Sequence, residues 1–356
     1  MDTKGTINRI DSLDYLRGLA ALGIMCYHMY LFTYGETDAS SVLARIKIYG
    51  VIIFYVLSGL TLYKVYANNF TFNKPVLTDF YIKRFFRIVP LLWMASILTM
   101  VFNYEPTYFT LKKLIANITV VLGAFKPETF IAKGAWSIGD ELFFYMLFPC
   151  LLWLVKFNKW LFWSFMGIAL ILLCYFTFYK LNPGIRLGEQ WANYVNPLGH
   201  VFYFGAGIAL GTIDGTEKFG KWALVAILSV CALIVFYPVS NGDPVVLVTG
   251  YNRLILSAFV IVLCFLFYKC NFEFLPRIVK NALHTLGAIS FSVYLIHPII
   301  YAVLKSLLSV FSEPNTAVLI SLTMVLTLVL SFYNYNYFEK YFIKRGKSFS
   351  LKLSVQ

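Results

Sequence analysis

The feature that most constrains this chain is a series of about ten long apolar segments separated by short polar ones. A helix needs roughly 20 mostly apolar residues to cross the hydrocarbon core of a bilayer. Hydrophobic residues make up 60% of the sequence and charged residues 13%, whereas soluble domains carry about a quarter charged residues. The sequence therefore predicts an all-α integral membrane protein, a bundle of about ten transmembrane helices, and excludes a soluble enzyme, a nucleic-acid binder and a secreted disulfide scaffold. The predicted spans are 14–33, 48–66, 85–103, 136–155, 160–179, 196–213, 222–239, 251–269, 286–307 and 316–338.

A further apolar stretch near 114–125 decides the predicted topology. It is only about a dozen residues long and contains Asn117 and Thr119, so it is short for a span and typical of a re-entrant segment. If this stretch is not a span, most lysines and arginines between the spans lie on the same side of the membrane as the N-terminus. If it is counted as a span, the basic residues no longer favour that side. Because basic loops stay in the cytoplasm, we expect both termini there. We also expect one membrane domain over residues 1–356.

The first span carries two ionisable residues, Arg17 and His28, in a place where lipid makes charge costly. Three helical turns separate them, so both project from nearly the same face, about 16 Å apart. One interpretation is structural: the arginine snorkels to the interface and the histidine bonds to a neighbouring helix. The other is that the two residues belong to a functional site, since intramembrane ionisable residues usually mark one.

The third span begins with three basic residues, Lys83, Arg84 and Arg87, at its predicted cytoplasmic end. The planar donors of an arginine side chain suit phosphate oxygens, which favours a phosphate-binding site. Anchoring of the span to lipid head groups explains the same residues, and the sequence leaves both interpretations open.

The fourth span begins with Trp136 and Ser137 and carries Glu141 and Tyr145. Interfacial anchoring accounts for the two aromatic residues. It does not account for Glu141, which lies about 7 Å below the predicted outer end of the helix and needs a partner there. A basic side chain on another helix is the partner that we expect.

The ninth span places His297 near the middle of the membrane, directly before Pro298. A proline inside a helix frees a backbone carbonyl close by. A histidine that packs between helices at a kink and a histidine in a reaction site are both consistent with this pattern. The six cysteines lack metal-ligand spacing, so we expect no metal site.

Taken together, these residues make the chain resemble the membrane-bound acyltransferase-3 family of bacterial integral-membrane O-acyltransferases. The resemblance covers nearly the whole chain and rests on six motifs that occur in the family's order. In this sequence they are Asp14-Tyr-Leu-Arg17 with His28, Phe54-Tyr-Val-Leu-Ser58-Gly59, Arg84-Phe-Phe-Arg87-Ile-Val-Pro90, Trp136-Ser137 with Glu141 and Tyr145, Tyr294-Leu-Ile-His297-Pro298, and Phe338-Glu339-Lys340-Tyr341-Phe342. Tyr55 and Tyr341 depart from the residues usual in the family, phenylalanine and proline.

The resemblance implies transfer of an acyl group, commonly acetyl, from cytoplasmic coenzyme A to a hydroxyl of a cell-surface or lipid-linked carbohydrate. It also implies a bacterial plasma membrane and the stand-alone type of the family, without an SGNH-hydrolase domain. We expect acyl-CoA, a carbohydrate or glycolipid acceptor and membrane lipids as partners, and no nucleic acid.

Specific roles follow as hypotheses from the residues and the resemblance together. Arg84 and Arg87, with Lys83 and Arg17 in support, bind the phosphates of coenzyme A. His28 acts as general base, or becomes transiently acylated, and Glu141 orients it or grips the acceptor. The residues expected to contact the acceptor are Trp136, Ser137, Tyr145 and His297.

A secondary transporter or flippase with a proton-coupled histidine is the alternative. Buried arginine, histidine and glutamate residues suit such a protein as well. The sequence shows no second copy of the Arg17–His28 pattern and no matching halves, which favours the enzyme.

Overall fold

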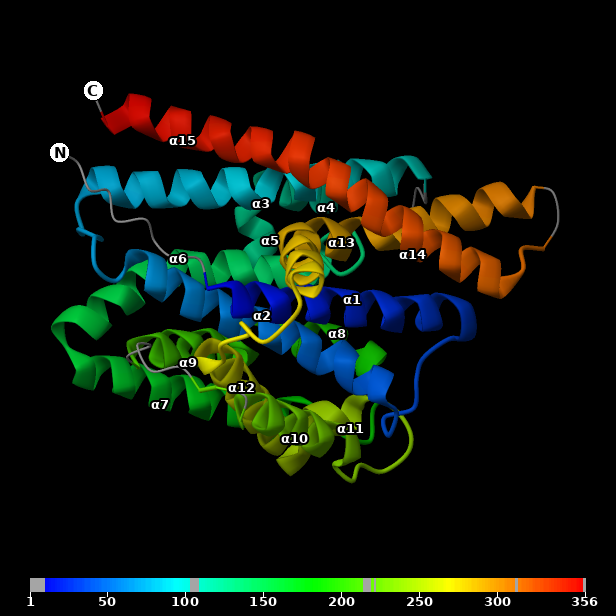
Figure 1. The fold of residues 1–356 in the computed structure, drawn as a ribbon, viewed down its shortest axis with the longest axis horizontal. Coiled ribbons are helices and arrows are strands. Elements are labelled where there is room, and N and C mark those ends of the chain that lie inside the picture. The colour runs from blue at the N-terminus through cyan, green and yellow to red at the C-terminus, as the bar shows by residue number, and fades with distance from the viewer. Residues whose placement is uncertain (1–9, 103–108, 214–218, 221, 311–312, 355–356) are drawn as a thin grey trace.

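The computed structural model describes residues 10–102, 109–213, 219–220, 222–310 and 313–354. Within these ranges the chain is helical and contains no β-strand, as Figure 1 shows. The elements are α1 Asp11–Tyr34, α2 Val42–Tyr66, α3 Lys74–Phe102, α4 Leu111–Thr119, α5 Val121–Phe125, η1 Pro127–Thr129, α6 Trp136–Phe157, α7 Lys159–Tyr175, η2 Phe176–Lys180, η3 Leu187–Gln190, α8 Trp191–Tyr194, η4 Pro197–Gly199, α9 Val201–Thr212, α10 Trp222–Phe236, α11 Val245–Val248, α12 Gly250–Lys269, α13 Arg277–Ser309, α14 Thr316–Tyr333, η5 Asn334–Glu339 and α15 Lys340–Ser354.

The chain is an integral membrane protein built from helices. Among the described residues, 7 helices are long and apolar enough to cross a membrane, namely Val42–Tyr66, Lys74–Phe102, Trp136–Phe157, Lys159–Lys180, Gly250–Lys269, Arg277–Ser309 and Thr316–Leu351. Each of the remaining predicted spans also falls on a helix. However, α1 is not in this set, and α9 and α10 are shorter apolar helices. The predicted fold class is confirmed, whereas the count of about ten spans is not.

Two pairs of glycines let the helices that carry the predicted motifs pack at very short distance. Where α1 crosses α13, a Cβ on Gly287 would lie 2.3 Å from the Asp14 carbonyl oxygen, and one on Gly18 would lie 2.7 Å from the Gly287 nitrogen. Where α2 crosses α9, a Cβ on Gly59 or on Gly207 would lie about as close to a backbone oxygen of the other helix. Small residues at helix crossings are the usual means of close packing in membranes.

The segment near 114–125 forms two short helices, α4 and α5, separated by Val120 with a positive φ of 59°. The side chain of Asn117 holds the segment to the loop that follows, because its amide donates to the Thr129 carbonyl at 3.0 Å and its oxygen accepts from the Ile131 backbone at 3.0 Å. Neither helix is long enough to cross a bilayer. That this segment enters the membrane and returns stays a prediction.

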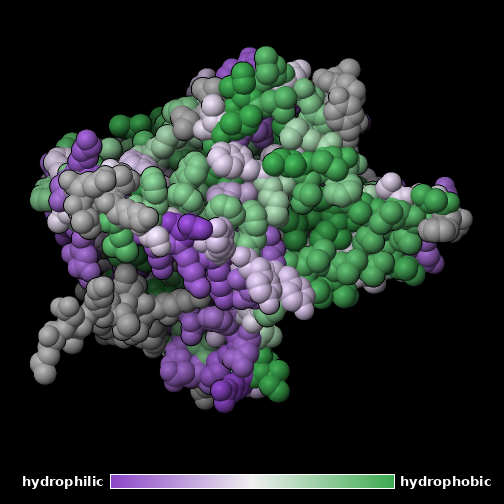
Figure 2. Space-filling model, turned by 90° about the horizontal axis from the view of Figure 1, so that it is seen from above, coloured by the Kyte–Doolittle hydropathy of each residue, from purple (hydrophilic) through white to green (hydrophobic). Residues whose placement is uncertain are grey.

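At the C-terminal end, α14 continues through a π-helical turn, η5, into α15, which runs alongside α3 (Figure 1). Ser350 donates a hydrogen bond to Asp79 between the two helices. Figure 2 shows a hydrophobic surface over the part of the molecule that holds α14 and hydrophilic residues toward the part that holds α15. The apolar helix therefore changes into a basic one, with Lys344 and Arg345 on its exposed surface.

Candidate active site

His28 on α1 and His297 on α13 form a hydrogen-bonded pair. Nδ1 of His28 lies 2.9 Å from Nε2 of His297, and Nδ1 of His297 lies 2.7 Å from the Val293 carbonyl oxygen. A carbonyl only accepts, so Nδ1 of His297 carries the proton, and in the neutral ring its Nε2 is an acceptor. His28 therefore donates through Nδ1, which leaves its own Nε2 without a proton. This is the protonation state that a general base requires.

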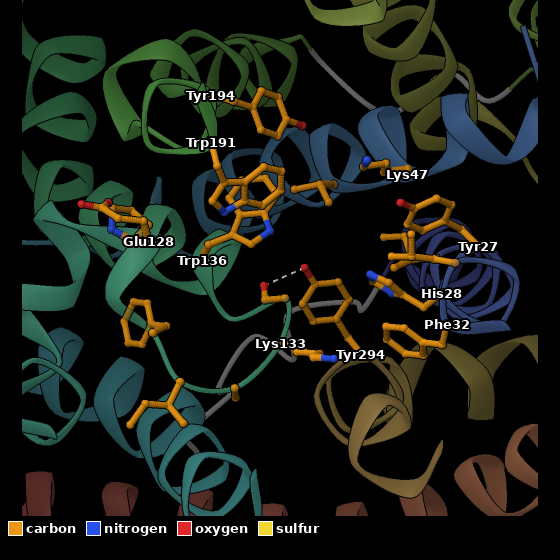
Figure 3. Close-up of a pocket in the computed structure, with 18 of the residues that line it drawn as sticks. Tyr27, His28, Phe32, Lys47, Glu128, Lys133, Trp136, Trp191, Tyr194 and Tyr294 are labelled. Atoms are coloured by element: carbon orange, nitrogen blue, oxygen red, sulfur yellow. Dashed lines mark hydrogen bonds between the residues drawn. The ribbon is translucent and has the colours of Figure 1, made fainter. Parts of the chain in front are cut away.

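His28 lines a cavity of about 570 Å³, which we call the histidine cavity. Figure 3 shows the α1 residues Tyr27, His28 and Phe32 on one side and Trp136 and Trp191 across from them. The ring of His28 is stacked on Phe32 with centroids 5.4 Å apart. The further residues of the lining are Ile24, Leu31, Glu36, Lys47, Val51, Pro127, Glu128, Phe130, Ile131, Ala132, Lys133, Gly134, Tyr194 and Tyr294. Aromatic faces with a few charged groups are a lining suited to a carbohydrate.

Charges in the histidine cavity are balanced. Lys47 forms an ion pair of 2.7 Å with Glu36, and its ammonium also lies over the ring of Tyr27. Lys133 lies over the ring of Phe32 at 5.0 Å from the centroid, and Glu128 lines the same cavity. Two carboxylates thus accompany two ammonium groups, so the cavity as a whole favours a neutral, polar ligand.

A second cavity of about 220 Å³, the arginine cavity, contains most of the other predicted site residues. Arg17 from α1, Arg84 and Arg87 from α3, and Ser137, Glu141 and Tyr145 from α6 all line it. The rest of the lining, from α2, α3, α6 and α13, is Phe54, Tyr55, Ser58, Thr61, Leu62, Val65, Ile88, Ile138, Ser290, Phe291 and Tyr294. The structure therefore gathers residues from distant parts of the sequence into one place.

The three arginines differ in their surroundings. Arg17 forms an ion pair with Asp14 at 3.1 Å. The guanidinium of Arg84 lies between aromatic rings, with its carbon 5.9 Å from the centroid of Tyr66 and 5.8 Å from that of Tyr145. Among the described residues no carboxylate forms an ion pair with Arg84 or Arg87. The Glu339 carboxylate does interact electrostatically with Arg87, whereas the neighbours of Arg84 are aromatic rings and the Tyr66 hydroxyl. Arg84 therefore keeps its charge available for an anion.

Glu141 does not contact His28. Its carboxylate accepts hydrogen bonds from the Ser58 hydroxyl at 2.8 Å and from Tyr145, one turn further along α6. The expected basic partner is not seen: Arg84 lines the same cavity, but among the described residues Glu141 forms no ion pair. The group that orients His28 is the imidazole of His297 instead.

Tyr294 forms the boundary between the two cavities, because it lines both. Its hydroxyl donates to the Gly134 carbonyl at 2.9 Å and lies 2.8 Å from the Ser137 hydroxyl. Gly134 has a positive φ of 81°, and a Cβ there would meet the Tyr294 hydroxyl at 3.3 Å. The glycine thus allows the turn before α6 to lie directly against the phenol ring.

Several predicted site residues lie elsewhere than expected. Lys83 does not line the arginine cavity and is paired with Asp79 at 2.6 Å. Tyr145 shares the arginine cavity with Glu141 and is separate from Trp136, which lines the histidine cavity. His297 touches His28 and is not part of either cavity's lining.

Most residues of the histidine cavity were not predicted from the sequence, among them Trp191, Tyr194, Lys133 and Glu128. These four residues lie in loops or in very short helices, where polar and aromatic residues carry no distinctive pattern. Tyr294 belongs to the same sequence motif as His297, and its place in that motif is the signal in the sequence that pointed to Tyr294.

Comparisons with known proteins show what the sequence is similar to. A family model described as an acyltransferase domain matches residues 10–335, a range that contains both histidines and all three arginines. Over 167 residues the chain is 25% identical to the peptidoglycan O-acetyltransferase OatA of Listeria monocytogenes. The aligned region covers 42% of this chain and 25% of that protein. No solved structure matches the chain.

Proposed function

Since the chain belongs to the acyltransferase family whose model spans residues 10–335, we propose that it is an O-acyltransferase that moves an acetyl group from acetyl-CoA to a carbohydrate hydroxyl. The peptidoglycan O-acetyltransferase similar to it supports a surface or lipid-linked glycan as the acceptor class. The proposed place is the plasma membrane of a bacterium, with both termini in the cytoplasm and the acceptor on the other side. Membership in the family favours an enzyme over the transporter considered above.

The observation that carries this proposal is the hydrogen-bonded chain from the Val293 carbonyl through His297 to His28. It leaves Nε2 of His28 as an acceptor beside a cavity lined with aromatic residues. An imidazole is suited to general-base work because its unperturbed pKa lies close to working pH. His28 then acts as the base, and His297 is a positioning residue.

The donor side of the proposal rests on the arginine cavity. Its volume of about 220 Å³ suits only part of the donor, which we propose to be the phosphates beside the arginines and the start of the pantetheine arm. Among the described residues Arg84 and Arg87 form no ion pair, although Glu339 interacts electrostatically with Arg87. Their guanidinium groups are suited to bidentate donation to phosphate oxygens. Arg17 is already paired with Asp14, so its proposed part is a supporting one.

In the proposed reaction, Nε2 of His28 removes the proton of an acceptor hydroxyl as that oxygen attacks the thioester carbonyl. A tetrahedral intermediate forms, the carbon–sulfur bond breaks, and the departing thiolate takes the proton from the imidazolium of His28. The products are the O-acyl ester and free coenzyme A. Because Tyr294 closes the boundary between the two cavities, its ring moves aside before the thioester reaches His28.

The test is release of free thiol from acetyl-CoA by the purified protein in the presence and absence of a carbohydrate acceptor. We expect His28→Ala to lower kcat by about 10²–10⁴-fold, the usual contribution of a general base, while acetyl-CoA still binds. Arg84→Ala and Arg87→Ala are expected to raise the KM for acetyl-CoA and to leave that for the acceptor unchanged. Activity near wild type in His28→Ala rejects the proposed base.

A further inference from the structure

A third cavity, of about 580 Å³, adjoins the histidine cavity and differs from it in the charge of its lining. We call it the lysine cavity. It shares Phe32 and Lys133 with the histidine cavity, so the two cavities lie side by side. The other residues of its lining all come from α13: Pro298, Tyr301, Ala302, Lys305, Ser306 and Ser309.

The α13 residues of this lining recur at intervals of three and four, so they lie on one face of the helix. That face begins one residue after His297 and continues toward the C-terminal end of α13. Lysine and serine side chains on it are unsuited to lipid. The face therefore borders a polar groove that leads away from the proposed reaction centre.

Lys133 and Lys305 give this groove its positive charge. The lining contains no carboxylate, and among the described residues no acidic side chain forms an ion pair with either lysine. Ser306 and Ser309 line the same groove, where the Ser309 hydroxyl donates to the Lys305 carbonyl at 2.6 Å. By contrast, Lys47 in the histidine cavity forms an ion pair with Glu36.

We propose that the lysine cavity binds an anionic group of the acceptor, a phosphate or a carboxylate, while its sugar ring occupies the histidine cavity. The inference rests on the proposed function and names its substrate class: an acidic carbohydrate. Two lysine side chains without a carboxylate partner among the described residues attract an anion from solution into the groove and fix its position there. An anionic substituent held by Lys133 and Lys305 places the sugar hydroxyls beside Nε2 of His28.

Two small acceptors test this, N-acetylglucosamine and N-acetylglucosamine 1-phosphate, which differ only at the anomeric carbon. With the full-length protein in a nonionic detergent, thiol release from acetyl-CoA gives kcat/KM for each. We expect a higher value for the phosphate, and Lys305→Ala and Lys133→Ala to lower that value by about tenfold. Lys305→Arg is expected to keep the preference.

The neutral sugar is the internal control for folding, since its kcat/KM is expected to change little in Lys305→Ala. Lys126→Ala is the matched surface control, because Lys126 is exposed and lines none of the three cavities. Equal values for the two sugars in the wild type overturn the proposal. So does an equal loss for both sugars in Lys305→Ala.

A binding measurement separates this inference from the proposed function. Equilibrium dialysis with each radiolabelled sugar, without acetyl-CoA, needs no turnover. If the wild-type protein binds the sugar phosphate more tightly than the neutral sugar, and Lys305→Ala abolishes this difference, the anion site is supported even when no transfer is seen. If the wild-type protein binds both sugars equally, the anion site is overturned. The dialysis is repeated in phosphatidylcholine nanodiscs with and without phosphatidylglycerol. If phosphatidylglycerol weakens binding of the sugar phosphate to the wild-type protein but not to Lys305→Ala, the lysines bind a lipid head group instead. That result overturns the proposal.

Discussion

At the scale of single residues, the chemistry of His28 depends on the residue to which it is bonded. Alone, a neutral imidazole has two tautomers, and only one of them presents an unprotonated Nε2 to the cavity. The Val293 carbonyl selects the tautomer of His297, and His297 in turn selects that of His28. A backbone carbonyl in one helix thus determines which nitrogen is basic in another.

This chain of bonds makes a prediction about His297. In His297→Gln the amide oxygen is able to accept from Nδ1 of His28, so we expect most of kcat to remain. In His297→Ala that acceptor is lost, the tautomers of His28 redistribute, and we expect kcat to fall by about tenfold, less than the loss expected for a general base. Steady-state kinetics with both variants check this, with the KM for acetyl-CoA expected to stay constant. Equal kcat in the two variants contradicts the positioning role.

A second prediction at this scale concerns the hydroxyl of Tyr294. Removing it in Tyr294→Phe breaks the bonds to Gly134 and Ser137 that hold the ring across the boundary. We expect water to reach the thioester more often, so acceptor-independent hydrolysis of acetyl-CoA rises several-fold. Thiol release without acceptor measures it. Tyr49→Phe is the control, since the Tyr49 hydroxyl donates to the Leu247 carbonyl away from the three cavities. No rise in Tyr294→Phe, or the same rise in both variants, argues against the boundary.

At the scale of the helices, the distance between α1 and α13 sets the geometry of the site. α1 carries Arg17 and His28, and α13 carries Tyr294 and His297. The 2.9 Å contact between the two histidines requires the helix axes to lie close together, and glycines at the crossing make this possible. Packing between backbones, with no side chain between them, therefore supports the hydrogen bond.

Substitution of one crossing glycine tests this dependence. Gly287→Ala places a methyl group against the Asp14 carbonyl, so the two helices separate. Overpacking of this kind costs about 1–3 kcal/mol. We expect a lower midpoint of thermal unfolding together with a loss of transferase activity. Gly167→Ala on α7 is the control, because a Cβ there meets nothing within 4 Å. An unchanged midpoint and activity in Gly287→Ala means that the crossing tolerates the methyl group.

At the scale of the whole molecule, the three cavities follow one another from the arginine cavity past Tyr294 to the histidine cavity and on to the lysine cavity. In the proposed reaction, a donor bound by arginines and an acceptor bound by lysines would approach His28 from different directions. This order suits transfer across a membrane, because each proposed substrate would enter from its own side and the two would meet only at His28.

The orientation implied by this order is a prediction of its own. After replacement of the native cysteines, we expect Lys126→Cys to react with a membrane-impermeant maleimide in intact cells. Lys344→Cys, on α15, is expected to react only after permeabilisation, since basic loops stay in the cytoplasm. Both positions are exposed, so accessibility within the protein does not limit the labelling. Labelling of Lys344→Cys in intact cells reverses the proposed orientation.

Much of this molecule can be predicted from its sequence, because lipid restricts what an apolar chain is able to form. A segment of about 20 apolar residues in a bilayer has to satisfy its own backbone, so the helices could be placed before their packing was known. The cost of charge in lipid singles out His28, Arg84, Glu141 and His297 in the same way. These inferences need only composition and spacing.

The tertiary structure alone decided which of these residues meet. Nothing in the spacing along the chain indicates that His28 bonds to His297, that Glu141 joins the arginines, or that Lys83 turns to Asp79. Loops supplied Lys133 and Trp191, which no periodicity marks. The physical reason is that the lipid environment determines the formation of each helix separately, whereas a cavity forms only between helices. Its lining therefore depends on how closely the helices pack.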